Sequence, residues 1–445
     1  GNGWRMLMES LAAGRGISLP SLSVGAAQMA CRATSAYGQV REQFGMPIGK
    51  FEGVSERIAN IAGHTYFMDA VRTLGAGAVD AGESPSVASA IAKAYLTEGM
   101  RLCLNDAMDI HAGAAIIRGP KNIFSRPYYS IPIGITVEGA NILTRSLIIF
   151  GQGAMRCHPF AHAEISAIAA KDLKAFDVAL FGHINHVMRN AMRAFITALS
   201  GGFFLDAPIG VGKSARHFNN LTRMCSVFAF IADVGLMTVG GALKRKEHLS
   251  GRYADAFAWL FMASAALKRF HDQGAQEPHR ALLDWTMAKA LYEVEQALIG
   301  VLANLPNRLV ANIAELIAFP LGTKHAALTD RQMDAVSDAV LAQDGRVRAA
   351  LTRDIYIPDV DEPGLGELEF TLDEIREAQP IRIKLDKARR NGRITKAPVQ
   401  SMAEEALQAK IISKEEYNRI IDAEIARNCV VQVDSYDSET FQTLK

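Results

Sequence analysis

The chain has 445 residues, and its 48 basic and 47 acidic side chains give a formal net charge of +1. This balance gives no reason to expect a nucleic acid as a partner, and the length favours two domains. The five cysteines are scattered, with no Cys-x-x-Cys pair. They indicate neither a disulfide framework nor a thiolate metal site, and they fit a reducing compartment such as the cytoplasm.

Helical periodicity extends over most of the chain, whereas strand signals are scarce. Apolar residues recur every three or four positions from Val54 to Leu74, which predicts a first amphipathic helix there. Ser84 before Pro85 has the form of a helix start, so a second helix should run from there to about Met108.

The same spacing continues further along the chain. It begins again at Leu143, and it recurs between Met287 and Val301. The apolar stretch from Val227 to Leu243 is interrupted by Asp233 and several glycines, so we predict a buried core helix rather than a membrane span.

Two helix starts are predicted near the C-terminus from capping-box patterns, Thr371 with Glu374 and Ser413 with Glu416. Pro159 should end a helix, and the proline- and glycine-containing stretch 354–370 is predicted to be a linker or lid. We therefore predict an all-α protein, with a four-helix bundle over residues 1–157 and a second helical domain over 158–445. The chain starts without Met or a signal peptide, so we expect it to be part of a longer protein.

Glu138 is the leading candidate for a catalytic base. It follows an apolar stretch and precedes Gly139, which lets the backbone approach a ligand closely. A helix start favours the ionised carboxylate and apolar surroundings disfavour it, and such opposed effects produce a poised base. The alternative is an ordinary glutamate that complements a helix dipole, and the spacing alone favours this alternative.

Two further segments have both a functional and a structural interpretation. Arg41 lies beside Phe44 at a helix end, where the pair could hold a phosphate or stack on an adenine, but Gly45 could simply close the helix. Gly113 lies in a small-residue turn whose N–H groups could face a pyrophosphate, and tight helix packing would explain the turn equally well.

The histidines make a weak case for a metal. His158 and His162 are four residues apart beside Cys157, but Pro159 interrupts their helix and the pattern places no carboxylate near them. His183 and the histidine three residues later lie on one side of a helix, where ordinary polar contacts are the favoured interpretation. We therefore predict no metal site.

In order and spacing, several segments together resemble the C-terminal half of acyl-CoA dehydrogenases. They are Gly14-Arg15-Gly16, the segment Arg41-Glu42-Gln43-Phe44-Gly45-Met46-Pro47-Ile48, the turn at Gly113, and Val137-Glu138-Gly139. The remaining chain, including 146–159 and Pro306-Asn307-Arg308, is similar to the long bacterial fatty acyl-CoA dehydrogenases that have an extra helical domain.

The resemblance implies FAD as cofactor and a fatty acyl-CoA as substrate, oxidised in β-oxidation to a trans-2-enoyl-CoA. Glu138 would take the α-proton, and the β-hydride would pass to the flavin. The resemblance also implies reoxidation by an electron-transfer flavoprotein and a homo-oligomer of two or more subunits. The residues that it assigns to the cofactor, some of them contacting a neighbouring subunit's FAD, are Arg41, Gln43, Phe44, Asp109, Gly113, Ala140 and Asn141, and those that it assigns to the substrate are Arg15 and Gly139.

Two alternatives remain open from the sequence. An acyl-CoA oxidase would use the same base but let oxygen reach the flavin. In the second alternative, residues 160–445 are a docking module for a protein or for the inner face of a membrane, with the apolar stretch Phe257 to Leu267 at the contact. Burial in the core is the favoured prediction for that stretch.

Overall fold

The structure is a computed structural model that describes residues 2–153, 158–202 and 205–443. It separates into two compact units. The first unit consists of Gly1–Val24, Tyr66–Met100 and Pro132–Gln332, and the second consists of Gly25–Thr65, Arg101–Ile131 and Met333–Lys445. Several long helices therefore contribute residues to both units.

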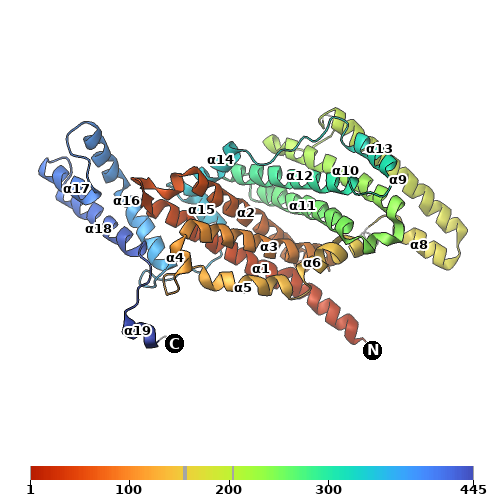
Figure 1. Cartoon of the computed structure of the whole chain (residues 1–445). Coiled ribbons are helices and arrows are strands. Elements are labelled where there is room, and N and C mark those ends of the chain that lie inside the picture. The colour runs from red at the N-terminus through yellow and green to blue at the C-terminus, as the bar shows by residue number, and fades with distance from the viewer. Residues whose placement is uncertain (1, 154–157, 203–204, 444–445) are drawn as a thin grey trace. The chain divides into compact units, whose positions relative to one another are not determined.

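In chain order (Figure 1), the elements are α1 (Gly3–Val40), β1 (Glu42–Gln43), β2 (Met46–Pro47), η1 (Ile48–Lys50), α2 (Glu52–Asp80), α3 (Ser86–His111), α4 (Gly113–Ile116), α5 (Ser125–Thr136), α6 (Asn141–Leu143), η2 (Thr144–Gln152), α8 (Ala161–Ala170), α9 (Leu173–Leu199), η3 (Gly212–Ser214), α10 (Ala215–Val239), η4 (Gly240–Arg245), α11 (Glu247–Asp272), η5 (Glu277–His279), α12 (Arg280–Leu302), α13 (Arg308–Ala318), α14 (Asp330–Leu341), α15 (Arg346–Leu351), α16 (Leu365–Arg390), α17 (Val399–Gln408), α18 (Lys414–Val430) and α19 (Ser438–Thr443). Here η2 is a π-helix and the other η elements are 3₁₀ helices.

The all-α prediction is confirmed, because strand structure among the described residues is confined to β1 and β2. The helices predicted from periodic apolar residues at 54–74 and 287–301 correspond to α2 and α12, and the helix predicted from Ser84 and Pro85 corresponds to α3. The capping box at Ser413 and Glu416 is also confirmed. The one at Thr371 is wrong: this residue lies inside α16, and its hydroxyl donates to the Glu367 carbonyl one turn earlier.

The segment after α1 forms a tight hairpin. Glu42 pairs with Pro47 and Gln43 with Met46. The two connecting residues, Phe44 and Gly45, have φ angles of 53° and 81°. Positive φ at both central positions is the geometry that matches the twist of a two-residue hairpin. Gly45 therefore completes a hairpin turn and does not close the preceding helix.

The first unit is built around α10, α11 and α12. Tyr253, Phe270 and Trp285 are fully buried among them. The predicted core helix from Val227 falls mainly in α10, where Val227 and Ile231 are completely buried. The stretch Phe257–Leu267 is also largely buried within α11, as its apolar pattern favoured.

One helix, 212–243, is long and apolar enough to cross a membrane, and half of its most apolar window is buried. The bent pair Ser125–Thr136 and Asn141–Gly151 passes the same test if its two parts count as one span.

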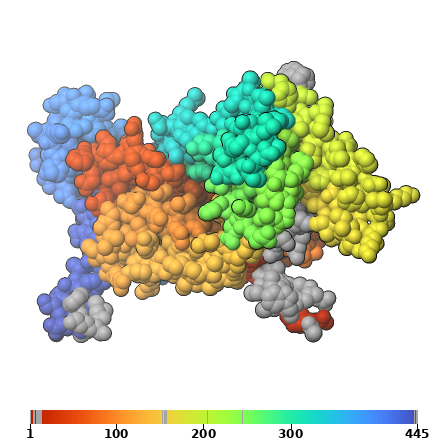
Figure 2. Space-filling model, turned by 45° about the vertical axis from the view of Figure 1, so that its right-hand side comes forward, coloured from red at the N-terminus to blue at the C-terminus, as the bar shows by residue number. Residues whose placement is uncertain are grey.

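An uncovered apolar face lies on α8 and α9. Leu173, Val178 and Phe181 on α9 are 73%, 70% and 68% exposed, and Ile168 on α8 is 61% exposed. These helices, coloured yellow, are open to solvent in Figure 2.

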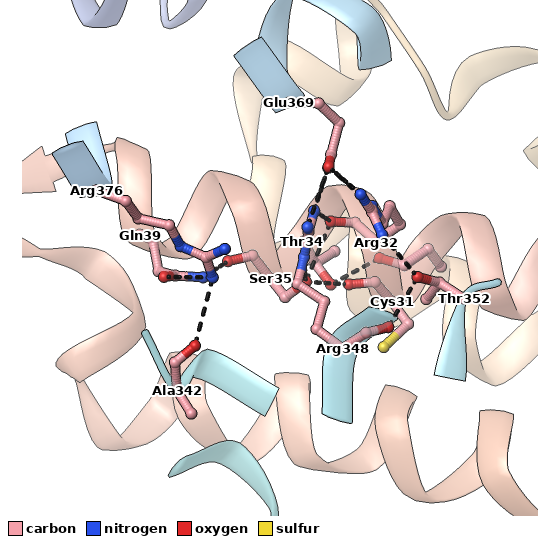
Figure 3. Close-up of polar contacts among 11 residues, drawn as sticks. Cys31, Arg32, Thr34, Ser35, Gln39, Ala342, Arg348, Thr352, Glu369 and Arg376 are labelled. Atoms are coloured by element: carbon pink, nitrogen blue, oxygen red, sulfur yellow. Dashed lines mark hydrogen bonds and ion pairs between the residues drawn. The ribbon is translucent and has the colours of Figure 1, made fainter. Parts of the chain in front are cut away.

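The second unit joins the later part of α1 to the helices at the C-terminal end of the chain. Figure 3 shows the polar network at this junction. Glu369 on α16 accepts hydrogen bonds from Arg32 Nε at 2.8 Å and from Arg348 Nη1 at 3.0 Å. Arg348 also donates to Ser35 Oγ at 2.8 Å and to the Arg32 carbonyl at 2.8 Å. The two guanidiniums thus share one carboxylate between three helices, α1, α15 and α16.

Removing this carboxylate charge should destabilise the second unit. In Glu369→Gln, Arg32 and Arg348 would remain largely buried without a counter-charge, and breaking such a pair costs about 3 kcal/mol. Urea unfolding followed by circular dichroism measures the change. The control is Glu377→Gln on the same helix, where a 59% exposed carboxylate pairs with Arg419 at the surface. We expect less than about 1 kcal/mol there, and equal effects of the two changes would contradict the account.

The same network has a defined pH dependence. Burial by itself raises the pKa of Glu369, but the hydrogen bonds and charges of Arg348 and Arg32 outweigh it and hold the pKa below its ordinary value of 4.5. Because the folded-state pKa is the lower one, the stabilisation is present above about pH 4.5 and is lost as the pH falls through the folded-state value.

Candidate functional site

Glu138 lies in the short connection between α5 and α6, three residues before α6 begins at Asn141. Its φ is 53° and that of Gly139 is 93°. The left-handed conformation costs a residue with a Cβ atom roughly 1–2 kcal/mol, and the φ of Gly139 strongly favours glycine. The sequence pattern placed Glu138 at a helix start. The structure instead places it on a turn that must be held from outside.

Lys93 on α3 holds this turn. Its ammonium donates to the carbonyls of Ile135 at 3.1 Å and Gly139 at 2.9 Å, and to Asn141 Oδ1 at 2.8 Å. Three N–H donors thus meet three acceptors around the Glu138 turn. Burial lowers the pKa of Lys93 to about 8, although the nearby Glu138 charge acts in the opposite direction.

Asn141 connects this turn back to α3. Its amide nitrogen donates to Thr97 Oγ1 at 2.9 Å, Glu98 Oε1 at 3.0 Å and the Ala94 carbonyl at 3.2 Å. The side chain is 6% exposed, and all its described hydrogen bonds go to protein groups. In this structure, Asn141 fixes the turn to α3. Contacts of Asn141 and of the exposed Ala140 with a cofactor stay predictions.

The Glu138 carboxylate is left open for a reactant. Its Oε2 is buried and has no hydrogen-bond partner. The backbone N–H of Glu138 likewise donates to no backbone carbonyl within the described ranges. Arg15 on α1 approaches the turn, and its Nη1 would lie 3.8 Å from a Cβ atom built on Gly139. The turn therefore presents an unpaired carboxylate oxygen and a free N–H from the same residue.

Arg15 places a positive charge near the negative charge of Glu138. Burial lowers the pKa of Arg15, and the Glu138 charge partly offsets that effect. Its Nε is buried without a partner, as is Glu138 Oε2. A cation and an anion that are both incompletely bonded form a site that a polar ligand could complete.

The other predicted residues lie in the second unit. Arg41 Nη1 donates to Tyr37 Oη at 2.9 Å, and the Tyr37 ring stacks on His111 with 4.0 Å between centroids. The remaining guanidinium nitrogens of Arg41 have no protein partner among the described residues. On the adjacent hairpin turn, the Phe44 ring is 93% exposed. An anchored cation beside a bare aromatic ring suits a ligand that has both a phosphate and a flat ring.

Gln43, on β1 of the same hairpin, is also exposed. Asp109 and Gly113 are also exposed, at the end of α3 and at the start of α4. The structure thus brings together Arg15 and the residues 138–141 in the first unit. Separately, it groups the Arg41 hairpin and the α3–α4 turn in the second. The assignment of each residue to a cofactor or substrate remains a prediction.

The expectation that no carboxylate lies near the histidines is wrong. Asp233 on α10 accepts from His158 Nε2 at 2.8 Å, and its Oδ1 is 3.4 Å from His183 Nε2. His183 Nδ1 also lies 2.8 Å from Glu164 Oε1. The three groups His158, His183 and Asp233 are close enough to share a metal ion, whereas His162 lies outside the group. Asp233 is 50 residues from His183 and 75 from His158 in the sequence, so local spacing could not predict these contacts.

The hydrogen bonds favour a structural role for this cluster. The backbone N–H groups of Phe160 and Ala161 donate to His158 Nδ1 at 3.2 and 2.9 Å. The neutral ring must therefore carry its proton on Nε2, where it donates to Asp233 and offers no lone pair to a metal. The cluster fastens the start of α8 to α9 and α10. The neighbouring Cys157 lies outside the described residues.

Lys93 is the functional residue that sequence reasoning missed. The available signal was a single cation in the alanine-rich stretch from Ser89 to Ala94, which is buried on α3. A lysine there needs several buried acceptors. The sequence does not show which carbonyls supply them, because those belong to a turn more than 40 residues away.

Comparison with known proteins gives a consistent result. A family model described as "Acyl-CoA dehydrogenase, C-terminal, bacterial type" matches residues 155–436, and one described as "Acyl-CoA dehydrogenase, C-terminal domain" matches residues 1–150. The "Probable acyl-CoA dehydrogenase FadE10" of Mycobacterium tuberculosis is 25% identical over 300 residues. That match covers 65% of this chain and 45% of the relative, so the chain corresponds to about half of the relative's length.

A shorter match and a solved structure extend the comparison. A "3-(aryl)acrylate reductase" of Clostridium sporogenes is 27% identical over 146 residues, which are 33% of this chain and 38% of the relative. The crystal structure of an acyl-CoA dehydrogenase complexed with FAD from Bacillus anthracis aligns with a TM-score of 0.59 and 17% identity. It covers 77% of this chain and 57% of that chain, and it supports the fold.

Removing the Lys93 ammonium should loosen the Glu138 turn. In Lys93→Met, the Ile135 carbonyl and Asn141 Oδ1 lose their donor, whereas the Gly139 carbonyl keeps the Thr144 hydroxyl at 3.2 Å. Each buried group left unbonded costs about 1–3 kcal/mol. We expect amide hydrogen exchange in residues 136–142 to accelerate by about tenfold or more. The control, Lys289→Met, removes a partly exposed lysine that pairs with Glu293 on α12. An unchanged exchange rate at the turn in Lys93→Met would show that packing alone holds it.

Proposed function

Because the chain belongs to the acyl-CoA dehydrogenase family, we propose that it supplies the catalytic base and part of the FAD-binding surface of an enzyme that converts a fatty acyl-CoA to a trans-2-enoyl-CoA. The observation that carries the proposal is the Glu138 turn, with its buried, unpaired carboxylate oxygen. A carboxylate without a protein partner is available to accept a proton from a bound substrate.

The residues of the turn would divide the work on a thioester. Glu138 Oε2 takes the proton from the α-carbon, and the Glu138 N–H donates to the thioester oxygen, where enolate charge develops. A fixed donor at that position contributes several kcal/mol to transition-state stabilisation in comparable oxyanion sites. FAD, when bound, supplies the acceptor for the hydride that leaves the β-carbon. Lys93 and Asn141 keep base and donor in register through their contacts to the turn.

The cofactor proposal also draws on the second unit. Arg41 is anchored on Tyr37 and keeps free N–H donors, and the exposed Phe44 ring stands on the same hairpin. These groups suit the phosphates and the adenine of FAD. We propose that they reach the cofactor of a neighbouring subunit, so the working unit is a homodimer or a higher oligomer.

The substrate class and the electron acceptor are part of the same proposal. A fatty acyl-CoA of β-oxidation and an electron-transfer flavoprotein agree with the family, whereas the reductase relative is named for the opposite direction of transfer. Flavin that is bleached by an acyl-CoA and stays bleached in air would support the dehydrogenase. Rapid reoxidation by oxygen would favour the oxidase alternative.

Substitution of the base tests the proposal directly. Glu138→Gln keeps the size of the side chain but cannot accept the α-proton. In the FAD-loaded enzyme to which this chain contributes the base, we expect acyl-CoA to bind while flavin reduction, followed by stopped-flow absorbance, slows by about 10³-fold. The control is Glu293→Gln, which removes a surface carboxylate on α12 and should react at the wild-type rate. A rate within tenfold of wild type in Glu138→Gln would rule out this base.

Substitution of Arg41 tests the cofactor surface. Arg41→Ala removes the guanidinium, so FAD should be lost during gel filtration while flavin-saturated protein still turns over. The matched control is Arg57→Ala in the same unit, where a 45% exposed guanidinium pairs with Asp106. If both variants retain FAD like the wild type, Arg41 only stabilises the helix end.

A further inference from the structure

A pocket in the second unit, lined by charged and apolar side chains, has no part in the proposed reaction. It lies between the end of α1 with its hairpin on one side and α16 and α18 on the other, and its volume is about 260 Å³. This is below the roughly 300 Å³ at which pockets for drug-sized ligands begin. The pocket therefore has room for a small ligand and not for a dinucleotide.

Four charged side chains in the pocket wall neutralise one another. Arg427 Nη2 lies 3.3 Å from Glu42 Oε1, and Arg427 is also paired with Glu424. Arg382 completes the set, with its Nη2 3.6 Å from Glu42 Oε2 and its Nη1 3.7 Å from Glu424 Oε1. Two cations and two anions cancel, so this set neither attracts nor repels an anion strongly.

Two further cations line the pocket without a counter-charge. Arg376 on α16 donates to Gln39 Oε1 at 3.3 Å and to the Ala342 carbonyl at 3.4 Å, and these contacts are visible in Figure 3. Its Nε is buried without a partner, and no carboxylate pairs with it among the described residues. Lys50, at the end of η1, also lines the pocket and makes no ion pair within the described ranges.

The charges around Arg376 compensate its positive charge only in part. Burial, followed by the positive charge of Arg348, lowers the pKa of Arg376, and nearby carboxylates offset this only in part. Gln343 and Gln379 line the same pocket, and their amides make no described hydrogen bonds. The pocket thus combines two cations that form no ion pair among the described residues with amide donors that can turn towards a ligand.

We propose that this pocket binds a small phosphate-bearing anion, held by Arg376 and Lys50 and by the Gln343 and Gln379 amides. A phosphate monoester has a charge of about −1.5 to −2 at pH 7, which matches the two unpaired cations. Its oxygens also accept several hydrogen bonds at once, as the fork of an arginine requires. A carboxylate would balance only one of the two charges.

The site has a structural consequence for the hairpin. Glu42, Pro47 and Lys50 belong to the hairpin segment and to η1, whereas Arg376 belongs to α16. An anion bound between them links the hairpin to the C-terminal helices and stiffens the segment that presents Arg41 and Phe44. The inference rests on the pocket alone and holds whether or not Glu138 is the base.

Calorimetric titration of the full chain with inorganic phosphate, at constant ionic strength, tests the proposal. We expect saturation at one equivalent and slower amide exchange in residues 41–50 when phosphate is bound. Arg376→Gln should weaken binding by about tenfold or more, and Lys50→Gln by several-fold, because each removes a charged hydrogen bond. Lys213→Gln, an exposed lysine paired with Glu277, is the control and should bind like the wild type.

A second titration distinguishes the sources of the phosphate. If adenosine 3′,5′-bisphosphate binds more tightly than phosphate, the ligand is a nucleotide phosphate such as that of coenzyme A, and otherwise it is free phosphate. Absence of saturable binding to the wild type, or equal affinity in the wild type and Lys50→Gln, would overturn the proposal. Because Lys50 is exposed, that variant decides the question even if Arg376→Gln fails to fold.

Discussion

Two successive residues with positive φ, Glu138 and Gly139, form a turn that persists only if its surroundings stabilise it. Lys93 provides this stabilisation from the adjacent helix, with one N–H for each of three acceptors. The acceptors are two backbone carbonyls and the side chain of Asn141, so one cation fixes both ends of the turn. The turn held in this way carries the unpaired Glu138 oxygen and the free Glu138 N–H.

In the second unit, a shared carboxylate holds the C-terminal helices on α1. The helices α16, α17 and α18 share a small apolar core around Leu385, Ala403 and Ile420, and they must also be fixed to the end of α1. The shared carboxylate of Glu369 does this through Arg32 and Arg348. A largely buried charge network adds less stability than apolar packing of the same volume, but it fixes one arrangement of the three helices. The hairpin with Arg41 and Phe44 extends from this fixed segment.

Part of this organisation is predictable from local sequence. Apolar spacing located α2 and α12, and a serine before a proline located the start of α3. A serine followed by a glutamate three residues later located the start of α18. The order of short motifs identified the family, and it made Glu138 the candidate base. These signals depend on neighbours along the chain, which a sequence shows directly.

The contacts that hold the site could not be predicted in the same way. Lys93 meets its partners across 42 to 48 residues, and Asp233 meets His158 across 75. Thr371 and Glu374 have the pattern of a helix start, yet α16 begins earlier, at Leu365, and continues through both residues. Each of these outcomes was decided by tertiary packing and not by local propensity.

In the proposed reaction, Glu138 is the base that faces the α-carbon of a bound thioester. A crystal structure of the FAD-loaded protein with an unreactive acyl-CoA analogue measures this directly. We expect Glu138 Oε2 to lie about 3–3.5 Å from the α-carbon, with the Glu138 N–H directed at the thioester oxygen. A complex in which Glu138 turns away and another carboxylate faces the α-carbon would contradict it.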